Sequence, residues 1–160
     1  MTDQTFDDLA FGIGPKLAAE IAEAWAWLVP PGWEPVLCAM IGGVFFQNET
    51  GVHWLDCLTG QVERVADDVA AFEARLAGDA EAFDNWFLPG LVARLHGEGK
   101  LPEPGQCYGC IIPPVFAQGA LVPDNVVVVV VRETLVGMAE VHRQIAAMPE
   151  GSKVRLKVVD

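Results

Sequence analysis

Apolar side chains recur at helical spacing near the start of the chain. The first stripe consists of Leu17, Ile21, Trp25 and Leu28. It predicts a helix that begins at Pro15 and is stopped by Pro30 and Pro31, because proline suits the first position of a helix and disrupts its interior.

Further helices are expected where capping residues precede apolar stripes. Asp67 and Asp79 have the chemistry of helix N-caps, Pro89 suits a first helical position, and Gly78 and Gly97 suit helix ends. They predict three short helices in succession. A final amphipathic helix is predicted from the stripe Leu135, Met138, His142 and Ile145.

Strand patterns lie between and after these helices. The predicted strands are Met40–Gln47, Val52–Cys57, Gln61–Val65, Val126–Val131 and Lys153–Val158, with a hairpin turn at residues 58–60. The valine run is typical of a strand buried on both faces, and the last strand alternates like an edge strand. The segment Leu101–Asp124 is rich in proline and glycine and is expected to be irregular.

This order of elements predicts an α+β fold, with a largely antiparallel sheet and helices packed to one side. The 160 residues suit a single domain, 1–160, with an N-terminal helical segment at 1–31 and the main body at 32–160. The longest apolar run is far shorter than a membrane-spanning helix, and no signal-peptide pattern is present, so we expect a cytoplasmic protein with reduced thiols.

The net charge of the chain restricts the classes of molecule that can bind to it. The chain has a formal charge of −12, and residues 1–100 hold 16 acidic and 5 basic side chains, against 6 and 5 in residues 101–160. Such a chain is repelled by nucleic acid and by anionic lipid, whereas a basic protein is attracted. The expected partner-binding residues, helped by Trp54, Trp86 and Phe87, are Asp56, Glu63, Asp67, Asp68, Glu73, Asp79, Glu81 and Asp84.

No residue pattern indicates catalysis, a metal or a cofactor. Ser152 is the only serine, and no glycine-rich segment continues into a nucleotide-binding motif. The pair Cys107 and Cys110 has the CxxC spacing, and Cys38 and Cys57 are the remaining candidates for a zinc site, but we expect buried thiols instead. The histidines His53, His96 and His142 lack metal-ligand spacing and are expected to be exposed or half-buried.

The irregular segment supports a second hypothesis, a small-molecule pocket or an enzyme site. Gln106, Cys107, Tyr108 and Asn125 are the residues that would line it. The structural alternative is that they brace the loop, with Tyr108 as a buried anchor whose hydroxyl is bonded and Asn125 as a turn residue. We favour the second interpretation.

From about residue 25 to residue 148 the sequence resembles the C-terminal domain family of bacterial type VI secretion immunity proteins, which often follows a GAD-like segment. The stretches that carry the resemblance are residues 43–46, 51–56, 86–87, 104–109, 113–114 and 124–125. The resemblance implies a cytoplasmic immunity protein that binds and neutralises a co-encoded effector toxin, such as a nuclease. An acidic inhibitor suits a cationic toxin, and we expect no enzymatic activity.

Overall fold

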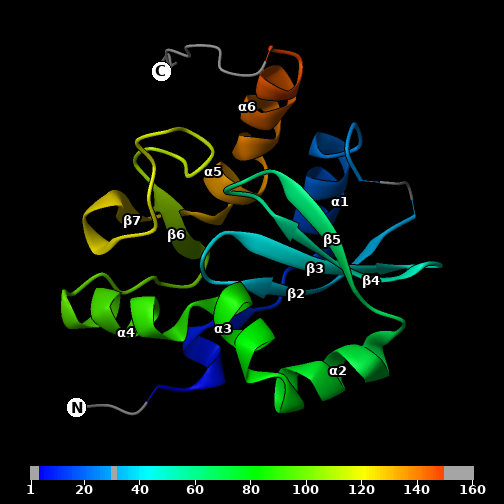
Figure 1. Cartoon of the computed structure of the whole chain (residues 1–160), viewed down its shortest axis with the longest axis horizontal. Coiled ribbons are helices and arrows are strands. Elements are labelled where there is room, and N and C mark those ends of the chain that lie inside the picture. The colour runs from blue at the N-terminus through cyan, green and yellow to red at the C-terminus, as the bar shows by residue number, and fades with distance from the viewer. Residues whose placement is uncertain (1–3, 30–31, 150–160) are drawn as a thin grey trace.

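The computed structural model describes residues 4–29 and 32–149 (Figure 1). Its strands are β1 (Ala10–Phe11), β2 (Glu34–Ala39), β3 (Gly43–Asn48), β4 (Gly51–Asp56), β5 (Gln61–Ala66), β6 (Gln106–Cys110) and β7 (Val126–Val130). Its helices are α1 (Pro15–Ala24), α2 (Val69–Gly78), α3 (Ala80–Phe87), α4 (Pro89–Gly97), α5 (Val131–Leu135) and α6 (Gly137–Ala146), with 3-10 turns η1 (Phe6–Asp8) and η2 (Pro123–Asn125).

Strands β1 to β5 form an antiparallel sheet in which neighbours in sequence are neighbours in space. The register places Trp54 of β4 opposite Phe45 of β3 and opposite Glu63 of β5. The predicted strands that correspond to β3, β4 and β5 are confirmed, with ends that differ by up to three residues. The sequence pattern does not predict β1, which has two residues, or β2, which contains Pro35 next to a shift in register.

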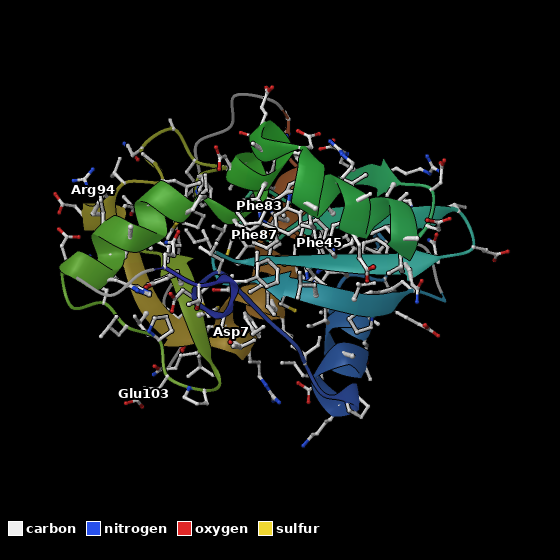
Figure 2. All side chains as sticks on the ribbon, turned by 90° about the horizontal axis from the view of Figure 1, so that it is seen from below. Asp7, Phe45, Phe83, Phe87, Arg94 and Glu103 are labelled. Atoms are coloured by element: carbon white, nitrogen blue, oxygen red, sulfur yellow. The ribbon has the colours of Figure 1, made fainter. Side chains whose placement is uncertain are left out.

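One face of this sheet is covered by α2 and α3, and α4 continues beyond its edge on the side of β6 and β7 (Figure 1). The Phe45 ring is at the centre of that layer, with ring centroids of Phe72, Trp86 and Phe87 at 4.6, 5.1 and 5.7 Å. Figure 2 shows Phe45, Phe83 and Phe87 gathered between the helices and the sheet. This aromatic layer fixes the position of α3 over β3 and β4.

The opposite face is covered by α1, α5 and α6. Trp25, which follows α1, is fully buried there, and its Nε1–H donates to the carbonyl oxygen of Leu135 at 2.7 Å. The α+β class and the antiparallel sheet are therefore confirmed. The helices pack against the sheet as expected, but they cover both faces rather than one.

Strands β6 and β7 form a separate antiparallel pair. Tyr108 links it to the main sheet through a parallel bridge with Ile41, and its backbone N–H donates to the carbonyl of Met40 at 2.8 Å. The expectation that Leu101–Asp124 is irregular throughout is wrong, since β6 lies within it. The expectation that the valine run is buried on both faces is also wrong, because Val130 is 54% exposed at the end of a two-stranded sheet.

Several predicted element ends also change. Helix α1 ends at Ala24, before the two prolines, because the chain turns where Trp25 enters the core. The N-cap of α2 is Asp68, whose carboxylate accepts the Ala71 N–H at 2.7 Å, and not Asp67, which pairs with Arg64. The predicted final helix is divided into α5 and α6 at Val136.

The N-terminal segment is not only helical, because β1 lies within it and pairs with β2. The predicted strand Lys153–Val158 and the two prolines at 30 and 31 lie outside the described residues. Among the helices of the described ranges, none has the length and apolar character needed to cross a membrane.

Candidate functional site

The candidate site begins at the junction of α2 and α3. Asp79 ends α2 and caps α3, where its carboxylate accepts the Ala82 N–H at 3.0 Å. Arg75, one helical turn earlier, donates from Nε and Nη2 to the same carboxylate at 3.3 and 3.1 Å. The Ala82 N–H and the Arg75 side chain lower the pKa of Asp79, so this carboxylate is ionised at neutral pH.

The Arg75 guanidinium also connects the helix to the sheet. Its Nη1 donates to the carbonyl oxygen of Val65 at the end of β5, at 2.8 Å. Its central carbon lies 4.9 Å from the ring centroid of Trp86, a distance at which a cation is attracted to the ring face. Each of the three guanidinium nitrogens therefore donates within the molecule, and the charge is matched by Asp79.

Trp54 and Trp86 form the wall of a cavity beside this ion pair. They are 8% and 6% exposed and lie against Phe45, with ring centroids 4.5 and 5.1 Å away. Trp54 can lie across β3 because the neighbouring residue there is Gly43, where an added Cβ would overlap the indole ring. In the described part of the chain, neither of these two indole N–H groups has a hydrogen-bond partner.

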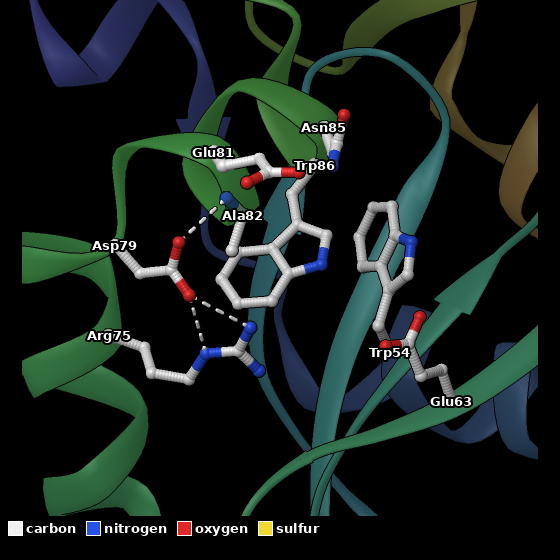
Figure 3. Close-up of a pocket in the computed structure, with 8 residues that line it drawn as sticks. All are labelled: Trp54, Glu63, Arg75, Asp79, Glu81, Ala82, Asn85 and Trp86. Carbon is white, nitrogen blue, oxygen red and sulfur yellow. Dashed lines mark hydrogen bonds and ion pairs between the residues drawn. The ribbon is translucent and has the colours of Figure 1, made fainter.

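The cavity has a volume of about 320 Å³ (Figure 3). Its lining residues are Trp54, Glu63, Arg75, Asp79, Glu81, Ala82, Asn85 and Trp86. Glu63, Glu81 and Asn85 are exposed at its rim and form no ion pair or side-chain hydrogen bond within the described residues. With Arg75 matched by Asp79, the lining has two uncompensated negative charges.

The structure brings together part of the predicted acidic surface. Glu63, Asp79 and Glu81 line the cavity. Asp67 and Asp68 are exposed just before α2, and Glu73 and Asp84 are exposed on α2 and α3. Asp56 is different, because it is half-buried at the end of β4 and its Oδ1 accepts the Leu58 N–H at 2.9 Å. Burial raises the pKa of Asp56, and its structural role is to hold the turn into β5.

Trp54, Trp86 and Phe87 were expected to help docking, but only the two tryptophans line the cavity. Phe87 is fully buried under α3, so the expectation that it contacts a partner is wrong. Arg75 and Asn85 are site residues that the sequence reasoning missed. The spacing of Arg75 and Asp79, four residues apart on a helix, is a signal that could have identified the ion pair.

The residues of the alternative loop site brace the chain. The Tyr108 hydroxyl donates to the carbonyl of Lys100 at 2.5 Å. Gln106 accepts the Glu103 N–H at 2.9 Å, and Asn125 makes hydrogen bonds of 2.8 to 2.9 Å with the backbone of Ile112 and Ala120. These contacts match the structural interpretation of the motif.

Three of the cysteines, Cys38, Cys57 and Cys107, lie in the apolar cluster beneath α1, α5 and α6, whereas Cys110 packs against the cluster on the opposite face of the main sheet. Burial raises the pKa of Cys38 and of Cys107 to about 12, and that of Cys110 to about 11, so these thiols are protonated at neutral pH. Over residues 4–29 and 32–149, no group of three or more His, Cys, Asp and Glu residues is placed to hold a metal ion.

The expectation that His142 is exposed or half-buried is wrong, because the structure buries it. Its Nε2 donates to the carbonyl oxygen of Cys57 at 2.9 Å, and its ring lies 5.8 Å from that of Trp25. Gly60 leaves room for the imidazole, since an added Cβ would come within 2.7 Å of it. His53 and His96 are half-buried, as expected.

A comparison of the sequence with profiles of known protein families found no match. A comparison with curated protein sequences found no significant match.

Proposed function

We propose that this protein is a cytoplasmic immunity protein that binds and neutralises a cationic effector toxin, such as a nuclease, and has no enzymatic activity. The observation that carries the proposal is the surface of unpaired carboxylates around the cavity. Glu63, Glu73, Glu81 and Asp84 are all exposed on β5, α2 and α3, and none forms an ion pair within the described residues. We call these four residues the acidic face.

The charge of the acidic face favours a basic protein as the partner. Unpaired carboxylates on neighbouring elements add their fields, which accelerates encounter with a cation and rejects acidic competitors. A nuclease must attract phosphate groups, so its cleft is positively charged and complements such a surface. The resemblance to immunity proteins points to the same class of partner.

The acidic face also accounts for how inhibition would work without chemistry. A protein that covers the entrance of a cationic active site neutralises the positive potential that attracts the substrate. It also blocks the space that the substrate would fill. The rigid α2–α3 junction, fixed by the Arg75–Asp79 pair, would present the carboxylates with little loss of conformational entropy on binding.

Co-expression with the toxin encoded beside this gene tests the proposal directly. Cells that carry both proteins should survive, and the purified pair should bind with an affinity that falls as salt concentration rises. The variant Glu63→Gln, Glu73→Gln, Glu81→Gln, Asp84→Asn should bind about tenfold or more weakly, since several favourable charge pairs are removed.

A control variant removes three carboxylates away from the acidic face, one fewer than the test variant. The variant Glu98→Gln, Glu103→Gln, Asp124→Asn alters three exposed carboxylates beyond α4 and near β6 and β7. It should bind the toxin almost as well as the unaltered protein. Survival that does not depend on this protein, or the absence of a complex with the neighbouring gene product, would count against the proposed function.

A further inference from the structure

The cavity beside Trp54 and Trp86 offers hydrogen-bond donors and aromatic rings, which the carboxylates of the acidic face do not. Both indoles are more than nine-tenths buried, yet neither N–H donates to an acceptor in the described residues. In Figure 3 the nitrogen edge of Trp86 is turned toward Trp54, whereas the nitrogen of Trp54 is on the edge that faces away from Trp86. Neither indole nitrogen is itself enclosed, since the Thr59 hydroxyl oxygen is the one fully enclosed side-chain polar atom without a partner in the described residues. An indole N–H that opens on the cavity can donate to a ligand carbonyl.

The charges of the lining residues determine whether the cavity favours a cationic or an anionic ligand. Arg75 is the only cation among the lining residues, and all its nitrogens already donate to Asp79 or to Val65. An anion entering the cavity would meet Glu63 and Glu81, and the one cation of the lining is already paired with Asp79. A cationic group would meet two unpaired carboxylates and the amide of Asn85.

The shape and chemistry of the lining favour a guanidinium over an ammonium. The guanidinium of Arg75 already lies over the Trp86 ring, 4.9 Å from its centroid. A guanidinium can stack flat on an indole face, and it offers five donors in a plane. Carboxylates and an amide oxygen at the rim can accept several of these donors at once. The volume of about 320 Å³ also leaves room for the aliphatic part of a long side chain.

From these observations we infer that the cavity receives a single arginine side chain of the protein partner. The guanidinium lies beside Trp54 and binds Glu63 and Glu81, and a backbone carbonyl of the same partner segment accepts the Trp86 Nε1–H. This inference rests on the proposed function, in that the arginine belongs to the neutralised protein. The inference adds a specific contact with one side chain to the general attraction between an acidic surface and a basic partner.

Titration of the full chain with short peptides tests the cavity without requiring the toxin. The probes are acetyl-Gly-Arg-Gly-amide and its counterparts with citrulline or lysine in place of arginine. Citrulline keeps the shape of arginine and removes the charge. The readout is the indole N–H signals of Trp54 and Trp86 in nitrogen-proton correlation spectra, assigned with the variants Trp54→Phe and Trp86→Phe.

The arginine peptide should shift both indole signals in a saturable way, with a dissociation constant on the order of 1 mM. The citrulline peptide should bind about tenfold or more weakly, and the lysine peptide several-fold more weakly. Binding of the citrulline or lysine peptide as tight as that of the arginine peptide would overturn the assignment. So would the absence of saturable shifts up to about 10 mM arginine peptide.

A pair of charge-matched variants separates the cavity from the surrounding surface. Glu63→Gln, Glu81→Gln removes the two rim carboxylates and should weaken the arginine peptide about tenfold. Glu73→Gln, Asp84→Asn removes two carboxylates that do not line the cavity and should change binding less than about twofold. Equal effects of the two variants would mean that general charge, and not the cavity, attracts the peptide.

The two proposals can fail separately. If the arginine peptide binds as expected but no toxin is neutralised, the cavity assignment stands and the proposed function is wrong. If the toxin is neutralised and its affinity is unchanged by Glu63→Gln, Glu81→Gln but falls in the four-residue variant of the acidic face, the function stands and the cavity assignment is wrong.

Discussion

Arg75 lies with its guanidinium 4.9 Å from the ring centroid of Trp86, and this contact joins the end of α2 to the buried face of α3. The same guanidinium binds the carboxylate that caps α3 and a carbonyl of β5. One side chain thereby sets the geometry of the cavity wall and cancels one of its negative charges. The stability of the α2–α3 junction and the shape of the candidate site are coupled through it.

Replacement of Arg75 should therefore cost more than the loss of an exposed ion pair. Arg75→Met keeps the aliphatic stem but removes the hydrogen bonds and the charge over Trp86. We expect the free energy of unfolding in urea to fall by about 1–2 kcal/mol. The control is Arg143→Met, because Arg143 is exposed and pairs with Glu140. An equal effect of the two substitutions would show that the contact with Trp86 contributes nothing.

Gly43 should be sensitive to any added side chain. An added Cβ at this position overlaps the indole of Trp54, so Gly43→Ala must displace a tryptophan from a packed aromatic layer. We expect a loss of about 1–3 kcal/mol in the free energy of unfolding and a shift in tryptophan fluorescence. Gly97→Ala is the control, because an added Cβ there meets nothing within 4 Å. Similar stabilities of the two variants would contradict the packing described for Trp54.

Local signals in the sequence predicted the elements of the α2–α4 region well. Asp79 and Pro89 act on the backbone within one helical turn, so their effect does not depend on distant parts of the fold. β2 was harder to predict because Pro35 interrupts its pattern, and its pairing partners lie elsewhere in the chain. The N-cap at Asp68 rather than Asp67 shows that adjacent acidic residues compete for one position, which spacing alone does not decide.

The candidate cavity could not be predicted from the sequence, although several of its residues were. Trp54 comes from β4 and Trp86 from α3, and only the packing of both on Phe45 brings them to one cavity. Composition identified the acidic stretch, but it could not separate Asp56, which holds a turn, from Glu63, which is free at the rim. Charge patterns indicate a class of partner, whereas a site depends on tertiary contacts.

His142 should make folding sensitive to mildly acidic pH. Burial lowers the pKa of His142 below its usual value of 6.5, so the unfolded chain binds more protons than the folded protein just below that pH. Stability contributed by the neutral imidazole is therefore lost as pH falls from about 7 toward 5. The melting temperature should fall by several degrees over this range.

The variant His142→Gln provides the comparison for this pH dependence. Glutamine can still donate to the carbonyl of Cys57 but does not titrate, so its melting temperature should vary less between about pH 7 and pH 5. Asp56 acts in the opposite direction, because burial raises its pKa and the folded protein takes up that proton first as pH falls. Asp56→Asn should therefore steepen the loss of stability toward acid. A profile in His142→Gln as steep as that of the unaltered protein would contradict the assignment to His142.

The four thiols should be unreactive in the folded protein. Cys38, Cys57 and Cys107 are fully buried, and burial raises the pKa of Cys38 and Cys107 to about 12, which leaves almost no thiolate at neutral pH. Cys110 is only half-buried, so it is the thiol that a reagent reaches first. Ellman's reagent at pH 7 should modify at most this one cysteine slowly in native protein and all four in denaturant, and the first reaction should disappear in Cys110→Ala.

The same measurement, combined with mass spectrometry for bound metal, addresses the CxxC motif. If Cys107 and Cys110 held a zinc ion, their thiolates would be coordinated, chelator would expose them, and the metal content would fall in Cys107→Ala, Cys110→Ala. We expect chelator to leave the reactivity and the melting temperature unchanged, because Cys107 packs among apolar residues beside Val131 and Leu135. Chelator-dependent reactivity would instead assign these two residues to a metal site and change the account of how β6 is held.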